Sequence, residues 1–293
     1  MIDATGMLLV TQLVTLLLGT LFFLWTAREL AEHKRENAKR EAQLLSQISG
    51  LSSRIGRVLS EDAFLLAQRC VFALSSASRG EPAGVGVLCG SAGSAVTACR
   101  NLRGAVTGSL VYGKVFPSAG ENSAPVQLTL KIVHFNPELD YAILHVVKPR
   151  AYPHFLPCYT GPLGGVTGGA ALALCAFPWA IQEDLLDEQF SSGLGVMSAN
   201  GVRLSPHARH LLYSCITYAG DSGGALLLQD GELVGVHLDF ANALREALAR
   251  RASVDVRLSG VEGSLAALVA GAGQGTCVAL LASEFERHVN GAA

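Results

Sequence analysis

The hydrophobic pattern changes character twice along the chain. From residue 7 to residue 27 nearly every side chain is apolar, whereas residues 28–43 are rich in charge. A helix-like spacing of apolar residues follows, and from Cys70 onward short alternating or wholly apolar runs recur, as in strands. This pattern predicts a membrane-length helix over 1–27, a helical stalk over 28–62 and a β-rich globular domain over 63–293.

The first apolar run has the length of a membrane span. A helix needs about 20 apolar residues to cross the hydrocarbon layer, and Trp25 suits the interface at its end. A cleaved signal peptide is the alternative, but it calls for a basic start and a small-x-small cleavage site, which are absent here. Basic residues follow the run and none precedes it, so the positive-inside rule predicts a single-pass membrane protein whose globular domain faces the cytosol.

The stalk carries a short heptad-like seam. Its apolar positions are spaced by 4, 3, 4 and 3 residues, as in a coiled coil, and are Leu44, Ile48, Leu51, Ile55 and Val58. Gly50 and Gly56 weaken this helix by about 1 kcal/mol each. Two interpretations stay open: self-association into a homo-oligomer through the stalk, or a helix that packs on its own globular domain.

Composition narrows the possible functions and partners. The net charge is −2, which does not favour nucleic-acid binding. The seven cysteines are scattered without a Cys-x-x-Cys motif, which is typical of buried free thiols in a reducing compartment rather than of a disulfide framework or a zinc site. We therefore expect no metal and no cofactor. Thirty-two glycines among many apolar residues suit short strands joined by tight turns.

One small-residue turn carries candidate chemistry. It is the segment Gly220-Asp221-Ser222-Gly223-Gly224, which an apolar run follows at once. Such a turn can point the backbone N–H groups of Gly220 and Ser222 at one spot beside a serine hydroxyl, as an oxyanion hole requires. A tight turn before a buried strand is the alternative interpretation, since a short motif by itself is weak evidence.

The longer pattern resembles the trypsin-like serine proteases, and among them the HtrA type. The nucleophile turn and the strand after it match, Asp140 stands in a segment like the family's Asp-x-Ala-x-Leu, and 191–199 resembles the HtrA strand Thr-Ser-Gly-Ile-Val-Ser-Ala. The resemblance covers about 70–290. It implies an all-β, chymotrypsin-like fold of two six-stranded antiparallel barrels, at about 70–150 and 165–293, with an insertion at 241–272 that contains one helical piece at 243–252.

The chain departs from this family at the catalytic base. Aligned without gaps, Arg100 stands where the family has its histidine, and Asp140 stands where the family has the aspartate that orients it. Arginine stays protonated and cannot take the proton of Ser222, so we expect an ion pair of Arg100 with Asp140 instead. A histidine from elsewhere could still serve as the base, and the candidates are His134, His207, His210 and His237.

His237 lies on the strand that follows the nucleophile. In this fold that strand lines the substrate pocket, and Gly-x-His there resembles viral cysteine proteases of the same fold in which the histidine recognises a glutamine side chain. A neutral imidazole can donate one hydrogen bond to an amide or a carboxylate. The alternative is a strand histidine that its neighbours satisfy.

These features lead to three functional hypotheses. The first is a membrane-anchored serine protease homologue that is catalytically impaired and binds or scaffolds a polypeptide or protein ligand. The second is an active serine endopeptidase that uses Ser222, Asp140 and an unusual base. The third is a structural membrane protein that acts through its stalk.

Overall fold

The computed structural model describes residues 58–75, 83–102, 104–116, 124–177, 194–218, 220–252, 260–273 and 275–291. The predicted membrane helix at 1–27 and nearly all of the predicted stalk lie outside these residues. In the described ranges no helix is both long and apolar enough to span a membrane.

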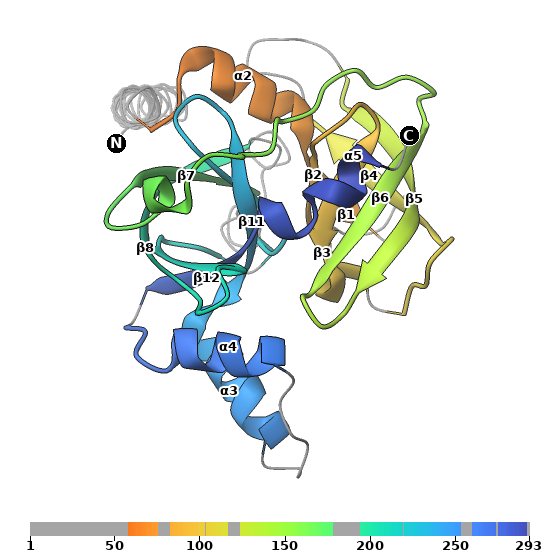
Figure 1. Ribbon diagram of the computed structural model, residues 1–293. Coiled ribbons are helices and arrows are strands. Elements are labelled where there is room, and N and C mark those ends of the chain that lie inside the picture. The colour runs from red at the N-terminus through yellow and green to blue at the C-terminus, as the bar shows by residue number, and fades with distance from the viewer. Residues whose placement is uncertain are drawn as a thin grey trace, which may run out of the picture. The chain divides into compact units, whose positions relative to one another are not determined.

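Two closed antiparallel barrels of six strands each form the fold, which confirms the predicted architecture (Figure 1). The first barrel follows the spatial order β1-β2-β3-β6-β5-β4 and the second the order β10-β11-β12-β9-β8-β7. The strands of the first barrel are β1 Val71–Ser75, β2 Gly84–Leu88, β3 Ser94–Ala98, β4 Leu110–Val115, β5 Val126–Asn136 and β6 Tyr141–Lys148. Those of the second are β7 Ala171–Ala176, β8 Gly195–Leu204, β9 His210–Ser214, β10 Ala225–Leu227, β11 Leu233–Phe240 and β12 Thr276–Leu281.

The apolar runs of the sequence fill the two barrels and the space between them. All five residues of β2 and all five of β3 are buried, as expected for strands without a solvent-facing side. The ring of Phe72 lies fully buried in the first barrel, and a Cβ at Gly86 would come within 2.3 Å of it. The glycine at this position therefore leaves room for an aromatic side chain.

Short helices surround the barrels. Helix α2 (Glu61–Cys70) precedes β1, and the Ser60 side chain caps it by accepting a hydrogen bond from the Ala63 N–H at 3.2 Å. Helix α2 thus begins inside the range predicted for the stalk and runs directly into the first barrel. At the other end of the chain, helix α5 (Glu286–Asn290) returns to the first barrel, where the Ser91 hydroxyl donates to the Val289 carbonyl at 2.7 Å.

The predicted insertion contains two helices rather than one. Helix α3 (Ala241–Ala252) continues directly from β11, and helix α4 (Gly260–Val269) packs beside it before β12 (Figure 1). The second helix corrects the expected single helical piece, because its sequence is rich in glycine, alanine and serine and has little local helix signal. Its apolar side chains Leu265, Leu268 and Val269 are buried, so tertiary packing stabilises it.

Candidate active site

Hydrogen bonds from the backbone N–H groups close the turn that carries Ser222. The Asp221 N–H donates to the Tyr218 carbonyl at 3.2 Å, and the Tyr218 N–H donates to the Asp221 carboxylate at 2.7 Å. Gly223 adopts a φ of +87°, and a Cβ there would lie 2.0 Å from the carbonyl oxygen of Val85. Only glycine fits this backbone conformation and this close approach to the first barrel.

The first barrel holds the nucleophile turn at the Ser222 carbonyl. That oxygen accepts hydrogen bonds from the Val85 N–H at 2.9 Å and from the Asn101 side-chain amide at 2.8 Å. Asn101 is buried and also donates to the Thr97 hydroxyl at 3.1 Å. Strand β11 holds the other side of the turn, where the Gly223 N–H donates to the His237 carbonyl at 2.8 Å.

The two predicted oxyanion-hole donors lie in this turn. Neither the Gly220 N–H nor the Ser222 N–H has a hydrogen-bond acceptor in the part of the chain that the structure describes. An N–H without an acceptor at a half-exposed position can bind the oxygen of a ligand.

The Ser222 hydroxyl is engaged with the backbone. It donates to the Leu238 carbonyl on β11 at 2.9 Å. A neutral peptide carbonyl does not take up a proton at ordinary pH, so this hydrogen bond orients the hydroxyl without making it a nucleophile. Activation would need a separate base within reach of the hydroxyl.

Arg100 and Asp140 form the ion pair that the sequence predicts. Arg100 lies in the short 3₁₀-helix η1 (Cys99–Leu102), and its Nε donates to the Asp140 carboxylate at 2.6 Å. The Arg100 backbone N–H donates to the other oxygen of the same carboxylate at 3.1 Å. Asp140 has a φ of +59°, a conformation that aspartate tolerates better than most residues, at the turn before β6 (Tyr141–Lys148).

A second carboxylate binds the same guanidinium from the second barrel. The Asp239 carboxylate on β11 accepts a hydrogen bond from Arg100 Nη1 and forms an ion pair with it. Arg100 therefore joins the two barrels across the candidate site, and one cation faces two carboxylates. Burial raises the pKa of Asp140 and Asp239 raises it further, while Arg100 acts in the opposite direction.

The four alternative histidines lie in different settings. His134 stacks on His288 with ring centroids 4.3 Å apart, and His207 is exposed in the turn before β9. His210 is buried, which lowers its pKa to about 4. For none of the four does the structure show, within its described ranges, a hydrogen bond to the Ser222 hydroxyl.

His237 is the histidine nearest to the nucleophile turn, since its N–H donates to the Gly224 carbonyl at 2.8 Å. Its imidazole Nδ1 and the Tyr213 hydroxyl are hydrogen-bonded at 2.7 Å. The imidazole is buried, and burial together with the Arg100 charge lowers its pKa to about 3. The imidazole is therefore neutral at physiological pH, with one nitrogen occupied by Tyr213.

Asp221 is the most buried carboxyl group of the site. Its side chain has no exposed surface, and its Oδ1 atom has no hydrogen-bond partner among the described residues. Burial raises its pKa to about 6, although the Tyr218 N–H partly stabilises the charge. A carboxylate buried in this way beside the nucleophile destabilises the fold when it is ionised.

Sequence patterns alone did not identify four residues that shape the site: Thr97, Asn101, Tyr213 and Asp239. Asn101 directly follows Arg100, and Asp239 lies two residues after His237, so both stand beside residues that the motifs singled out. A search for charged or amide side chains next to each motif position could have found them. The Asn101–Ser222 and Arg100–Asp239 contacts join residues more than a hundred positions apart, however, and only the folded barrels bring them together.

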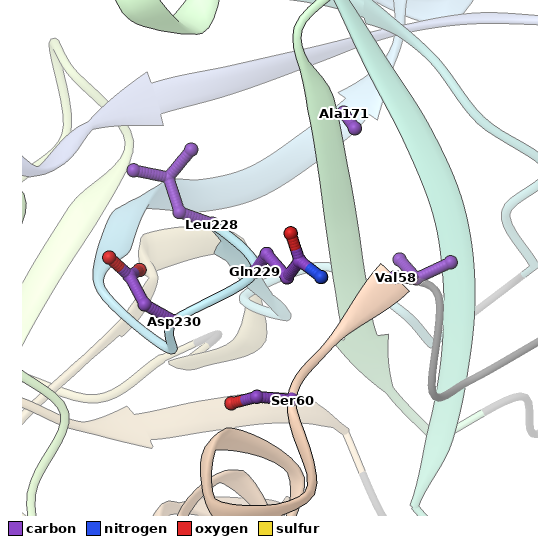
Figure 2. A pocket seen from close by; sticks show the side chains of 6 residues that line it. All are labelled: Val58, Ser60, Ala171, Leu228, Gln229 and Asp230. Atoms are coloured by element: carbon purple, nitrogen blue, oxygen red, sulfur yellow. The ribbon is translucent and has the colours of Figure 1, made fainter.

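A surface hollow of about 490 Å³ lies away from these residues. It lies between the segment before α2, strand β7 and the turn between β10 and β11 (Figure 2). The residues that line it are Val58, Ser60, Ala171, Leu228, Gln229 and Asp230. None of the predicted site residues lines it. Among the described residues no group of His, Cys, Asp or Glu is arranged to hold a metal ion.

Comparison with known families agrees with this fold and site. The trypsin-like peptidase domain family matches residues 84–236, which is more than half of the chain. The chain therefore belongs to the trypsin-like peptidase domain family. The suspected family is thus confirmed, whereas no curated protein sequence matches the chain.

Solved structures of bacterial proteases share the fold at low sequence identity. An inactive form of Rv3671c from Mycobacterium tuberculosis H37Rv, with its serine changed to alanine, is 18% identical, with a TM-score of 0.50 over 81% of this chain and 94% of that one. The MamO protease domain from Magnetospirillum magneticum is 12% identical, with a TM-score of 0.50 over 77% and 98%. A serine endoprotease from Yersinia pestis is 14% identical, with a TM-score of 0.51, over 78% of this chain and 65% of that one.

Proposed function

We propose that this protein is a trypsin-like serine protease homologue that has lost ordinary proteolysis and binds polypeptide segments beside Ser222. One observation carries the proposal: the Arg100 guanidinium occupies the Asp140 carboxylate, while the Ser222 hydroxyl donates to a backbone carbonyl. Within the described residues the serine then has no general base hydrogen-bonded to it, and Asp140 pairs with a guanidinium rather than with an imidazole.

Arginine at this position opposes catalysis in two ways. The guanidinium stays protonated at any physiological pH and cannot act as a general base. The guanidinium also pairs with Asp140 and Asp239 at the same time. If Arg100 moved away to free Asp140, both half-buried carboxylates would lose their counter-charge. Substrate binding and the oxyanion hole alone leave only weak residual catalysis when a triad member is lost.

The binding function rests on groups that survive without the base. The N–H groups of Gly220 and Ser222 can hold the carbonyl oxygen of a bound peptide. We assign His237 to the ligand pocket: if the Tyr213 hydroxyl donates to Nδ1, the proton of the neutral imidazole sits on Nε2, which can donate to a side-chain amide or carboxylate of the ligand.

The cellular setting of the proposal rests on the sequence. The apolar run at 7–27 would anchor the chain as a single-pass membrane protein, and the basic residues after it would keep the globular domain in the cytosol. The apolar seam at 44–58 would let the stalk self-associate. A homo-oligomer would then present several copies of the candidate site to one ligand.

A binding assay with the full chain in detergent tests the proposed function. A fluorescent, permanently unfolded polypeptide such as alkylated casein serves as the ligand, and both its anisotropy and its integrity are followed. We expect saturable binding without cleavage. Ser222→Trp places a bulky ring beside the N–H donors and should abolish binding, whereas Val106→Trp, at an exposed turn of the first barrel, should leave it unchanged.

The same assay separates the other two hypotheses. Cleavage that Ser222→Ala abolishes would identify an active endopeptidase with an unusual base. Absence of both binding and cleavage would favour a structural protein acting through its stalk. Deletion of 28–57, which spares the α2 cap at Ser60, would then reduce the oligomer size.

A further inference from the structure

All lysines of the globular domain lie on three neighbouring strands of the first barrel. Residues 58–293 contain three lysines, and these are Lys114 on β4, Lys131 on β5 and Lys148 on β6 (Figure 1). All three are exposed. No lysine follows Lys148 in the sequence, so the second barrel has none. The lysine charge is therefore concentrated on one part of the surface.

The register of the strands places two of these lysines in adjacent rows across the sheet. In one row Lys131 pairs with Leu110 on β4 and with His145 on β6. In the next row Thr129 pairs with Lys148. Because Thr129 and Lys131 are two residues apart on one strand, they point to the same side of the sheet. Lys131 and Lys148 therefore share a face.

The third lysine extends the same face by one more row. Lys114 pairs with Gln127, which stands two residues before Thr129 on β5. The intervening residues Leu128 and Leu130 are buried in the barrel. The odd-numbered positions of this part of β5 thus face outward, and the three rows form one solvent-facing surface.

The lysines of this surface have no counter-charge. Strands β4, β5 and β6 contain neither aspartate nor glutamate, and within the described ranges none of the three lysines forms an ion pair. Arginines such as Arg100, Arg209 and Arg251 do form such pairs. Lys114 Nζ instead lies 5.2 Å from the centroid of the Phe116 ring. The positive charge of the surface is therefore available to an external anion.

Exposed apolar side chains accompany the lysines. Leu110 is 51% exposed and faces Lys131 across the sheet, and Val133, two residues further along β5, is 38% exposed. A surface that combines cations with apolar side chains suits an anionic bilayer, where the headgroups neutralise the lysines and the acyl boundary takes up the apolar groups. An acidic polypeptide would need the charges alone. We call this surface, formed by Leu110, Lys114, Lys131, Val133 and Lys148, the lysine face.

We propose that the lysine face docks on the anionic lipid headgroups of the leaflet next to which the domain is anchored. This inference rests on the membrane anchor proposed above for 7–27, which would keep the domain beside the cytosolic leaflet with its anionic lipids. Thirty residues, 28–57, separate the apolar run from Val58. Even as a helix they would span about 45 Å, so the chain is long enough for this face to reach the bilayer.

Reconstitution of the full chain into vesicles tests the lysine face. Vesicles of phosphatidylcholine are compared with vesicles of phosphatidylcholine and phosphatidylserine in a ratio of about 7:3. Acetylation of Lys131 by an uncharged reagent is followed by mass spectrometry. We expect acetylation to be at least about fivefold slower in the anionic vesicles, because docking covers the lysine, and we expect high salt to remove the difference.

Two matched double variants show whether the face itself docks. Lys114→Gln/Lys148→Gln removes two charges and keeps Lys131 as the reporter. Each lysine near an anionic surface contributes about fivefold to binding, so this variant should dock about 25-fold more weakly and should lose the protection of Lys131. Arg69→Gln/Arg250→Gln removes the same charge at exposed positions of α2 and α3 and should keep the protection.

Flotation separates failure of the anchor from failure of the face. A chain that does not float with neutral vesicles would refute the anchor, but the lysine face would still predict flotation with the anionic vesicles, which Lys114→Gln/Lys148→Gln should abolish. Equal reactivity of Lys131 in both lipids, or protection that this variant retains, would overturn the proposal. Protection by soluble polyglutamate but not by anionic vesicles would assign the face to an acidic protein and would also overturn it.

Discussion

At the scale of single residues, the chemistry of the site depends on the group at position 100. A histidine there could accept the Ser222 proton and return it to a leaving group, because its pKa lies near neutrality. The Arg100 guanidinium instead forms ion pairs with Asp140 and Asp239 and cannot exchange a proton. Under the proposed function, the identity of this one side chain separates a hydrolase from a binding protein on the same fold.

The variant Arg100→His should gain Ser222-dependent hydrolysis of an unfolded peptide substrate. The new imidazole would lie beside Asp140, which can orient it, and general-base catalysis contributes about 10²–10⁴-fold in rate. The measurement is substrate turnover by the full chain, with Arg100→Gln and the double variant Arg100→His/Ser222→Ala as controls. A well-folded Arg100→His protein that stays inert would show that Arg100 is not the sole defect.

Asp221 gives the site a pH-dependent stability. Its pKa in the folded chain is about 6, above the ordinary value of 3.8, so the folded state binds the proton more tightly than the unfolded state does. Its contribution to stability is therefore fully present below pH 3.8 and is lost as the pH rises through about 6. Ionised Asp221 destabilises the fold at neutral pH.

The variant Asp221→Asn should be more stable than the wild type at neutral pH, by about 1–3 kcal/mol, because it removes the buried charge and keeps an acceptor for the Tyr218 N–H. The difference should shrink as the pH falls from about 6 towards 4, and it should vanish below pH 3.8. Urea unfolding of both proteins across this pH range measures it. A variant that is less stable than the wild type at neutral pH would contradict this account of Asp221.

At the scale of elements, one arginine side chain, Arg245, links the two helices of the α3–α4 insertion. Arg245 on α3 donates three hydrogen bonds to carbonyls at the end of α4 and just beyond it, two to Val269 at 3.0 and 2.6 Å and one to Ala272 at 2.8 Å. The last carbonyls of a helix have no partner within the helix, so a neighbouring guanidinium satisfies them. Arg245 of α3 thus supplies the hydrogen-bond donors that the carbonyls at the C-terminal end of α4 lack.

The variant Arg245→Ala should lower the free energy of unfolding by about 1–3 kcal/mol, because half-buried carbonyls lose their donors. The exposed Arg250→Ala on the same helix is the matched control and should change it by less than about 0.5 kcal/mol. Denaturant unfolding compares the two, and hydrogen exchange at 260–269 should rise only in Arg245→Ala. Equal free energies of unfolding for the two variants would mean that the α3–α4 insertion does not depend on Arg245 for its stability.

At the scale of the whole molecule, local patterns explain the barrels better than the site. Alternating and apolar runs predict short buried strands, because each strand carries its own burial pattern, and the resemblance to the family implies two six-stranded barrels. They do not predict that Asp239 reaches Arg100, or that Asn101 holds the Ser222 carbonyl, since these contacts join residues more than a hundred positions apart. Such contacts arise only when the barrels pack together.

The Arg100–Asp140 ion pair was predictable for a different reason. The alignment with the family places Arg100 at the histidine position, next to the aspartate position of Asp140. A guanidinium beside a carboxylate is expected to form an ion pair. No family motif covers helix α4, and neither its apolar spacing nor its composition distinguishes it from a glycine-rich loop, so the sequence does not predict this helix.

The measurement that tests the central claim most directly is fluorophosphonate labelling of the full chain in detergent, with Ser222→Ala as the control and trypsin as the reactive reference. The probe modifies a serine only where a base activates it beside a working oxyanion hole. We predict no Ser222-dependent labelling of the folded wild type. Labelling that Ser222→Ala abolishes would show that a group other than Arg100 serves as the base, and it would contradict the assignment of this protein as a non-proteolytic binding homologue.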